Sequence, residues 1–261
     1  MFVRKQSNGE LILIGQTDHS RFVGQLAAHW GNGDFEGPKP YESVVRGAVY
    51  HDYGWLRYET NPLIDPETGV PREFRGTPFS QVQIDSYQWC IDWLMGVDPY
   101  SGLLAGMHRV GLWKGRYDKI AHPAGRYNPQ GPRPEIKAFI ERNEPSQEKQ
   151  RAAVGQDTIW TNYHLLQVWD LLGLYFCCQE PYEDYIEPVP VSYSGEHNGM
   201  RLTMKPAGAG RVVFEPYPFN ERPLRVQIAC KRLPQSSFPD VETFRGFYFR
   251  AQPEQLRYEL V

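Results

Sequence analysis

The chain has 261 residues, 14% of them aromatic, so it is long enough to bury a substantial core. Its formal net charge is −3, with 28 Lys and Arg against 31 Asp and Glu, which gives no electrostatic reason to expect a nucleic acid polymer as partner. The most apolar stretch, LLQVWDLLGLYFCC, contains an aspartate and is shorter than the ~20 residues that cross a bilayer. We therefore expect no membrane partner.

The four cysteines form no C-x-x-C pair, and the first 14 residues carry charges where a signal peptide would be apolar. Both features favour a cytoplasmic protein with reduced thiols that serve as small core residues.

A β-hairpin opens the predicted fold, with FVRKQ and LILI joined by a turn at Asn8-Gly9. The hydrophobic residues then recur with the period of an amphipathic helix in several segments. Helices are predicted at residues 17–31, 43–54, 82–96, 101–113, 135–153 (interrupted near Pro145) and 157–178. The last of these is apolar on nearly every side, which is typical of a helix in the centre of a fold.

The pattern changes after Glu180. PYEDYIEPVPV contains three prolines and reads as a linker, and later segments are β-branched and aromatic. Strands are predicted in MRLTMK, RVVFEPYPF, LRVQIACKRL, FYFRA and LRYELV. The expected fold is mainly α, a helical bundle with a small C-terminal antiparallel sheet that the N-terminal hairpin can extend. The expected division is a helical domain at 1–180 and a linker with a small β subdomain at 181–261.

Asp170 is the most informative polar residue, because it lies in the apolar helix segment HLLQVWDLLGLYF. A buried carboxylate there must be paired, protonated or bound to a cation. One interpretation is that Asp170 pairs with an arginine or caps a loop. The other interpretation is that Asp170 forms a metal site with Asp52 and with three histidines that lie on apolar helix faces. Taken singly, each of these histidines would be explained as a core residue hydrogen-bonded to a carbonyl. These five residues are our candidate metal ligands: His19, His51, Asp52, His108 and Asp170.

The order of these residues resembles a known pattern. His19, then His51-Asp52 in YHDYGW, then Asp170 is similar to the H…HD…D arrangement of HD-domain metal-dependent phosphohydrolases. More closely, the chain resembles a bacterial family of unknown function that is distantly like HD domains. The segments that carry this resemblance, from Gln16 to Phe219, are QTDHSRFVGQLAAHWG, YHDYGW, LLAGMHRVGL, LQVWDLLGLYFC and EPYPF. The resemblance implies an HD-domain-like bundle in which His108 lies where dinuclear members have a further histidine.

The ligand types suit a divalent ion, with Mn, Fe, Mg, Ni and Zn all compatible. Asp52 can hold the metal with one oxygen and orient a water with the other, and His108 can be a second-metal ligand or a proton donor, so these two are the candidate catalytic residues. Arg46, Arg109 and Trp55 are the candidate substrate-binding residues. However, many HD enzymes have lysine where this chain has Trp55.

The leading hypothesis is a metal-dependent hydrolase of phosphomonoesters or phosphodiesters, with a nucleotide or another small phosphorylated molecule as substrate. One alternative is a non-catalytic, metal-stabilised ligand-binding or sensor protein. Another is an iron-dependent oxygenase on the same helical frame. A homodimer is compatible with the sequence and is not required by it.

Overall fold

The computed structural model describes residues 1–77, 80–114, 133–194 and 199–261. Its strands form one seven-stranded sheet with the order β1-β2-β6-β7-β5-β4-β3. Strands from the two ends of the chain are therefore neighbours in one sheet. The strand bounds are β1 Phe2–Lys5, β2 Leu11–Ile14, β3 Asp184–Val189, β4 Met200–Pro206, β5 Arg211–Glu215, β6 Leu224–Leu233 and β7 Pro253–Leu260.

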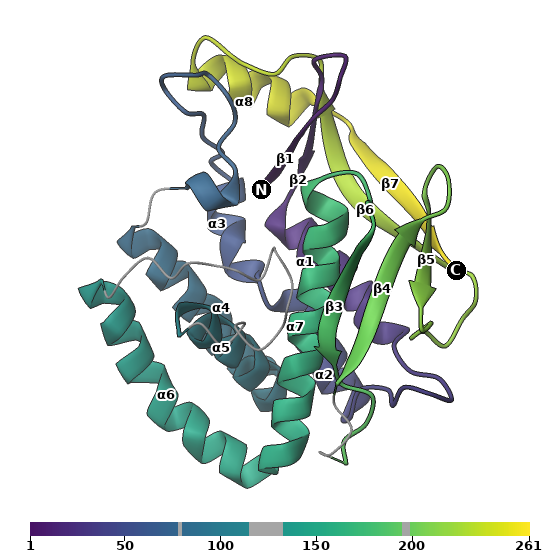
Figure 1. The fold of residues 1–261 in the computed structure, drawn as a ribbon. Coiled ribbons are helices and arrows are strands. Elements are labelled where there is room, and N and C mark those ends of the chain that lie inside the picture. Colours follow the sequence, from purple (N-terminus) through teal and green to yellow (C-terminus); the bar gives the residue numbers. More distant parts are fainter. Residues whose placement is uncertain (78–79, 115–132, 195–198) are drawn as a thin grey trace.

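The sheet curls around two helices, α1 (Gln16–Ala28) and α7 (Gln156–Cys178) (Figure 1). Helix α7 packs against both edge strands, β1 and β3, whereas α1 packs against the inner strand β6. The inner face of the sheet and these helices form the main hydrophobic core, which includes Phe22, Trp169, Phe176 and Phe214. The curvature follows because one helix can touch both edges of a sheet only if the sheet bends around it.

Most of the other helices extend this core on the side away from the sheet, whereas α8 packs near β6 in a separate hydrophobic cluster with Leu11 and Leu13 of β2. Helix α2 packs on α1, and α4, α5 and α6 pack against one another beyond it (Figure 1). The bounds of the remaining helices are α2 Tyr41–Tyr50, α3 Leu56–Glu59, α4 Gln81–Val97, α5 Pro99–Trp113, α6 Pro134–Val154 and α8 Val241–Arg250. Short 3₁₀ turns cover Tyr53–Trp55 and Phe74–Gly76.

The prediction of a mainly α, HD-domain-like bundle with a small C-terminal antiparallel sheet is wrong. The fold is mixed α/β, and the N-terminal hairpin forms one edge of a large sheet through the pairing of β2 with β6. The sheet is not purely antiparallel either, because β5 and β7 run parallel. The division of the chain at residue 180 stays a prediction. In the described part of the chain, the helices are too short or too polar to cross a membrane.

Two segments also have a different secondary structure from the one that we predicted. The segment FYFRA, which we predicted to be a strand, ends helix α8, whose N-cap Asp240 accepts a hydrogen bond from the Thr243 backbone N–H at 2.7 Å. The proline-rich segment that we predicted to be a linker contributes β3. Proline is compatible with β3 because an edge strand has one side on which no ladder hydrogen bond is required.

The start of α1 is capped from outside the helix. Its N-cap residue, Gly15, has no side chain to accept a hydrogen bond from the first turn. Glu59, the last residue of α3, accepts instead from the Gln16 backbone N–H and, at 2.6 Å, from the Thr17 hydroxyl. A carboxylate at this end also complements the helix dipole. This contact fixes α1 close to the residues that follow His51 and Asp52.

Replacing Glu59 with alanine should lower the free energy of unfolding by about 1–2 kcal/mol, because two donors in the first turn of α1 lose their acceptor. Urea denaturation followed by circular dichroism measures this change. Glu67→Ala, at an exposed loop position, is the control and should change the value by less than about 0.5 kcal/mol. Equal stabilities of the two variants would contradict the capping role of Glu59.

Candidate metal centre

Four of the five predicted metal ligands meet in one buried cluster. His19 comes from α1, His51 and Asp52 directly follow α2, and Asp170 comes from the middle of α7. One donor atom from each lies within 4.8 Å of the other three, and none of the side chains is more than slightly exposed. Residues 151 positions apart in sequence are thus brought into contact by the packing of three helices.

Small residues let these helices approach closely. A Cβ atom added at Gly24 in α1 would lie 2.2 Å from Val49 Cγ2 in α2. A Cβ added at Gly173 in α7 would lie 2.4 Å from the Cε1 atom of the His19 ring. Both contacts are shorter than atoms tolerate, so glycine at these positions sets the spacing of the cluster.

Asp170 is the centre of the cluster. Its Oδ1 atom lies 2.9 Å from Nε2 of His19 and 3.3 Å from Nε2 of His51. Burial alone would raise the pKa of this carboxyl, but the hydrogen bond with His19 and the close approach of His51 and His108 hold the pKa well below its usual range. Asp170 is therefore an ionised carboxylate inside an apolar helix.

His51 is oriented for ligation through its Nε2 atom. Its Nδ1–H donates to the Ala48 carbonyl at 2.8 Å, and the Ser20 hydroxyl lies 3.1 Å from the same nitrogen. A neutral imidazole with a proton on Nδ1 has its lone pair on Nε2, and metal-binding histidines commonly donate to a carbonyl in this way. Within the described residues, Nε2 has no hydrogen-bond partner although it is buried.

The electrostatics around His51 favour a positive charge. Burial by itself would lower its pKa, but Asp52 and Asp170 outweigh burial, and the pKa is raised. A proton or a cation at Nε2 balances the two carboxylates.

Asp52 divides its two oxygens between different partners. Oδ1 accepts a hydrogen bond from Nη2 of Arg109 at 2.6 Å, and Oδ2 lies 3.7 Å from Nε2 of His51. The Arg109 guanidinium also lies over the Tyr87 ring, 3.6 Å from its centroid. Burial would raise the pKa of Asp52, but His51, Arg109 and His108 lower it, so this carboxylate is ionised as well.

His108 lies beside the cluster and is not one of its four members. Its Nε2 atom is 4.0 Å from Oδ1 of Asp52, and its ring centroid is 4.7 Å from that of His51. Burial, together with neighbouring His51, lowers the pKa of His108 to about 3, so its imidazole is neutral near pH 7. The predicted role of His108 as a metal ligand or a proton donor stays a prediction.

The predicted substrate-binding residues lie in three different surroundings. Arg109 is next to the cluster, as an ion-pair partner of Asp52. Arg46 forms an ion pair with Asp98, the N-cap residue of α5, so the structure places it in a contact between helices.

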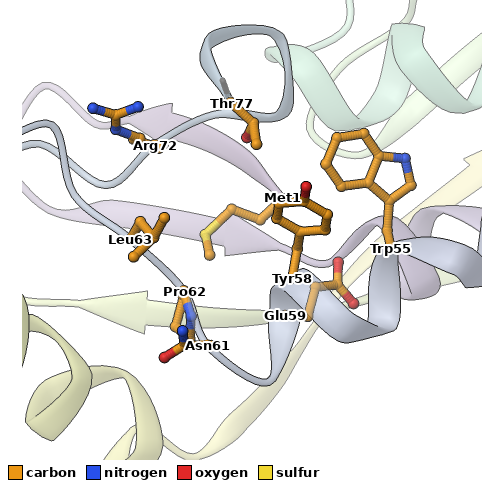
Figure 2. A pocket seen from close by; sticks show the side chains of 9 residues that line it. All are labelled: Met1, Trp55, Tyr58, Glu59, Asn61, Pro62, Leu63, Arg72 and Thr77. Carbon is orange, nitrogen blue, oxygen red and sulfur yellow. The ribbon is translucent and has the colours of Figure 1, made fainter. Parts of the chain in front are cut away.

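Trp55 is buried in a second hydrophobic cluster with Tyr87. Figure 2 shows that Trp55, Tyr58 and Glu59 line one side of a pocket, with Met1 and Thr77 next to them. The substrate-binding roles of Arg46, Trp55 and Arg109 stay predictions.

Sequence reasoning missed the residues that hold the ligands in place. Ser20 is fully buried, and its hydroxyl both faces His51 and accepts from the Asp52 backbone N–H at 3.3 Å. Gly173 leaves room for the His19 ring, and the Tyr87 ring lies against the Arg109 guanidinium. Ser20 could have been found from the sequence, because it is a polar residue next to His19 in a helix with many apolar residues. The contacts of Gly173 and Tyr87 could not, because they leave no pattern in a single sequence.

The four residues fit a divalent cation. They offer two imidazole nitrogens and two ionised carboxylates in a buried space, and the Nε2 lone pair of His51 is oriented toward the carboxylates. Imidazole and carboxylate suit Mn, Fe and Zn, while Mg prefers a larger share of oxygen. The structure thus contains a mixed α/β protein core with a buried His/His/Asp/Asp group that could hold a metal ion.

A family model describing a protein of unknown function (DUF3891) matches residues 1–235. The chain belongs to this family. No curated protein and no solved structure matches the chain significantly, so none of the comparisons links it to HD domains.

Replacing Gly173 with alanine should move the His19 ring away from Asp170, because the new methyl group would overlap the ring. We expect a loss of about 1–3 kcal/mol in the free energy of unfolding, as for other insertions into a packed core. Urea denaturation measures the loss, and long-range ¹H–¹⁵N NMR of the imidazoles follows His19. Gly96→Ala is the matched control, because nothing lies within 4 Å of a Cβ at this helical position. Unchanged imidazole signals in Gly173→Ala would refute the packing argument.

Proposed function

We propose that this protein is a metal-dependent hydrolase that cleaves a phosphate ester in a nucleotide or another small phosphorylated molecule. The observation that carries the proposal is the buried Nε2 atom of His51, which has no hydrogen-bond partner within the described residues and faces two ionised carboxylates. A buried ring nitrogen that faces two carboxylates in this way is costly unless a proton or a metal cation binds to it.

The charge balance of the site supports an anionic substrate. Asp52, Asp170 and Arg109 together leave one net negative charge when the imidazoles are neutral, as metal ligation requires. Adding a divalent ion changes this to one net positive charge. A phosphoryl group is thus attracted to the ion in a space with little water to screen it.

Each residue has a role that its position supports. His19, His51, Asp52 and Asp170 would hold the ion, which supplies a water of lowered pKa and neutralises charge on a phosphoryl oxygen. Neutral His108, 4.0 Å from Asp52, can accept or relay a proton at its Nε2 atom. Because Asp52 accepts a hydrogen bond from Arg109, we assign this proton transfer to His108 and not to Asp52.

Phosphate esters are chosen over other substrates because of the order of the ligands. The sequence His, His-Asp, Asp resembles the motif of HD-domain phosphohydrolases, and the structure brings these four residues together although the fold contains a large sheet. The lysine that often follows that motif is replaced by Trp55, which is buried among aromatic residues. Arg109 is the cation next to the cluster that could contact substrate in its place.

One observation favours a non-catalytic, metal-stabilised protein as a second candidate. His19, His51, Asp52 and Asp170 are all at most 6% exposed, as in metal sites that only stabilise a fold. An iron-dependent oxygenase would use the same ligands, and iron as the bound metal together with oxygen consumption would identify it.

Metal analysis of the purified protein tests the site itself. We expect Mn, Fe or Zn to co-purify without chelators, and we expect His51→Ala and Asp170→Asn to lose it, since each removes one of the four donors. His29→Ala, which alters a half-exposed histidine outside the cluster, should retain it. A metal-free wild-type protein whose melting temperature does not respond to Mn²⁺ would refute the metal site.

Hydrolysis tests the reaction. The Mn²⁺-loaded protein should release nitrophenol from p-nitrophenyl phosphate or from bis-p-nitrophenyl phosphate, or phosphate from nucleotides, and His51→Ala should reduce the rate by at least about 100-fold. Activity that survives in His51→Ala would assign it to a different site. A metal-loaded protein inactive on all these compounds would favour the non-catalytic candidate.

A further inference from the structure

A permanent positive charge, the guanidinium of Arg109, lies next to the proposed metal site. We infer that Arg109 occupies the position that a second metal ion would take in a dinuclear centre, so that the chain binds one divalent ion. The inference rests on the proposed metal site and specifies its stoichiometry.

The two oxygens of Asp52 carry the argument. In a dinuclear centre a carboxylate typically bridges two ions, with one oxygen on each, and the ions lie about 3.5–4 Å apart. Here Oδ2 faces the His51 side of the cluster, whereas Oδ1 is 2.6 Å from a guanidinium nitrogen of Arg109. Asp52 therefore has one oxygen to offer to a metal ion.

The other ligand of a second ion would be His108. Its Nε2 atom lies 4.0 Å from Oδ1 of Asp52, a separation at which one cation could contact both atoms. Arg109 is the next residue in α5, and its guanidinium contacts that same oxygen. A second ion and the guanidinium would compete for Oδ1, and two cations so close together repel each other strongly when buried.

Arg109 is held firmly in this position. Its guanidinium lies over the Tyr87 ring at 3.6 Å and 5.7 Å from the centroid of the Trp113 ring, and the residue is 8% exposed. Displacing it would separate a buried ion pair and a cation–π contact at once. Arginine also stays protonated at all accessible pH values, so this charge is constant.

Arg109 is thus a positioning residue that restricts Asp52 to one metal contact. It also supplies, without a second metal, the positive charge that a bridging carboxylate requires.

The test is a count of Mn²⁺ bound to the full-length protein, by titration and by elemental analysis, together with the electron paramagnetic resonance spectrum. Wild-type protein should bind one Mn²⁺ per chain and give the spectrum of an isolated ion. Arg109→Lys retains the charge and should do the same. Arg109→Met removes the charge at similar length, and it should bind a second Mn²⁺ per chain at high Mn²⁺ concentration, with a spin-coupled spectrum.

The outcomes separate this inference from the proposed metal site. No bound Mn²⁺ in the wild-type protein would refute the metal site. Two bound Mn²⁺ in the wild-type protein would confirm a metal site and refute the role of Arg109. A folded Arg109→Met variant that binds one Mn²⁺, like Arg109→Lys, would also overturn the inference; if Arg109→Met does not fold, the wild-type count and spectrum decide alone.

Discussion

An ionised carboxylate in the middle of an apolar helix is the constraint around which this molecule is organised. Asp170 lies in α7, the helix that both edges of the sheet contact, and a bare charge there would be far too costly to bury. Its compensation comes from His19 and His51, which lie on two other elements. The packing of α1 and α2 against α7 and the neutralisation of Asp170 therefore depend on each other, so a group that could hold a metal ion results from a requirement of the core.

The sequence predicted the members of this site better than it predicted the fold around them. His19, His51, Asp52 and Asp170 could be found because polar groups on apolar helix faces break a periodic pattern. The contact between Asp52 and Arg109 could not, because two residues 57 positions apart have no local signal that links them. For the same reason, the sequence could not show that Arg46 pairs with Asp98, and Arg46 was predicted to contact substrate instead.

The longer helices from α1 to α7 were predicted close to their bounds because their hydrophobic period extends over ten residues or more, although α6 continues through Pro145, where we predicted an interruption. The arrangement of the sheet was not predicted. Most of its strands were recognised one by one, but their order depends on pairings between the two ends of the chain. Proline in β3 and aromatic residues in α8 also gave local preferences that the tertiary structure overrode. Local patterns thus identified elements and ligands, and long-range contacts decided how they were assembled.

The place of β7 in the sheet has a consequence for synthesis on the ribosome. This strand is the last in chain order, yet it pairs with β6 along eight residues and also with β5, near the middle of the sheet. Until it emerges, no strand pairing among the described residues joins the half that contains β1, β2 and β6 to the half that contains β3, β4 and β5. Both halves then expose unpaired backbone to other chains, so the nascent chain has reason to depend on chaperones until β7 is complete.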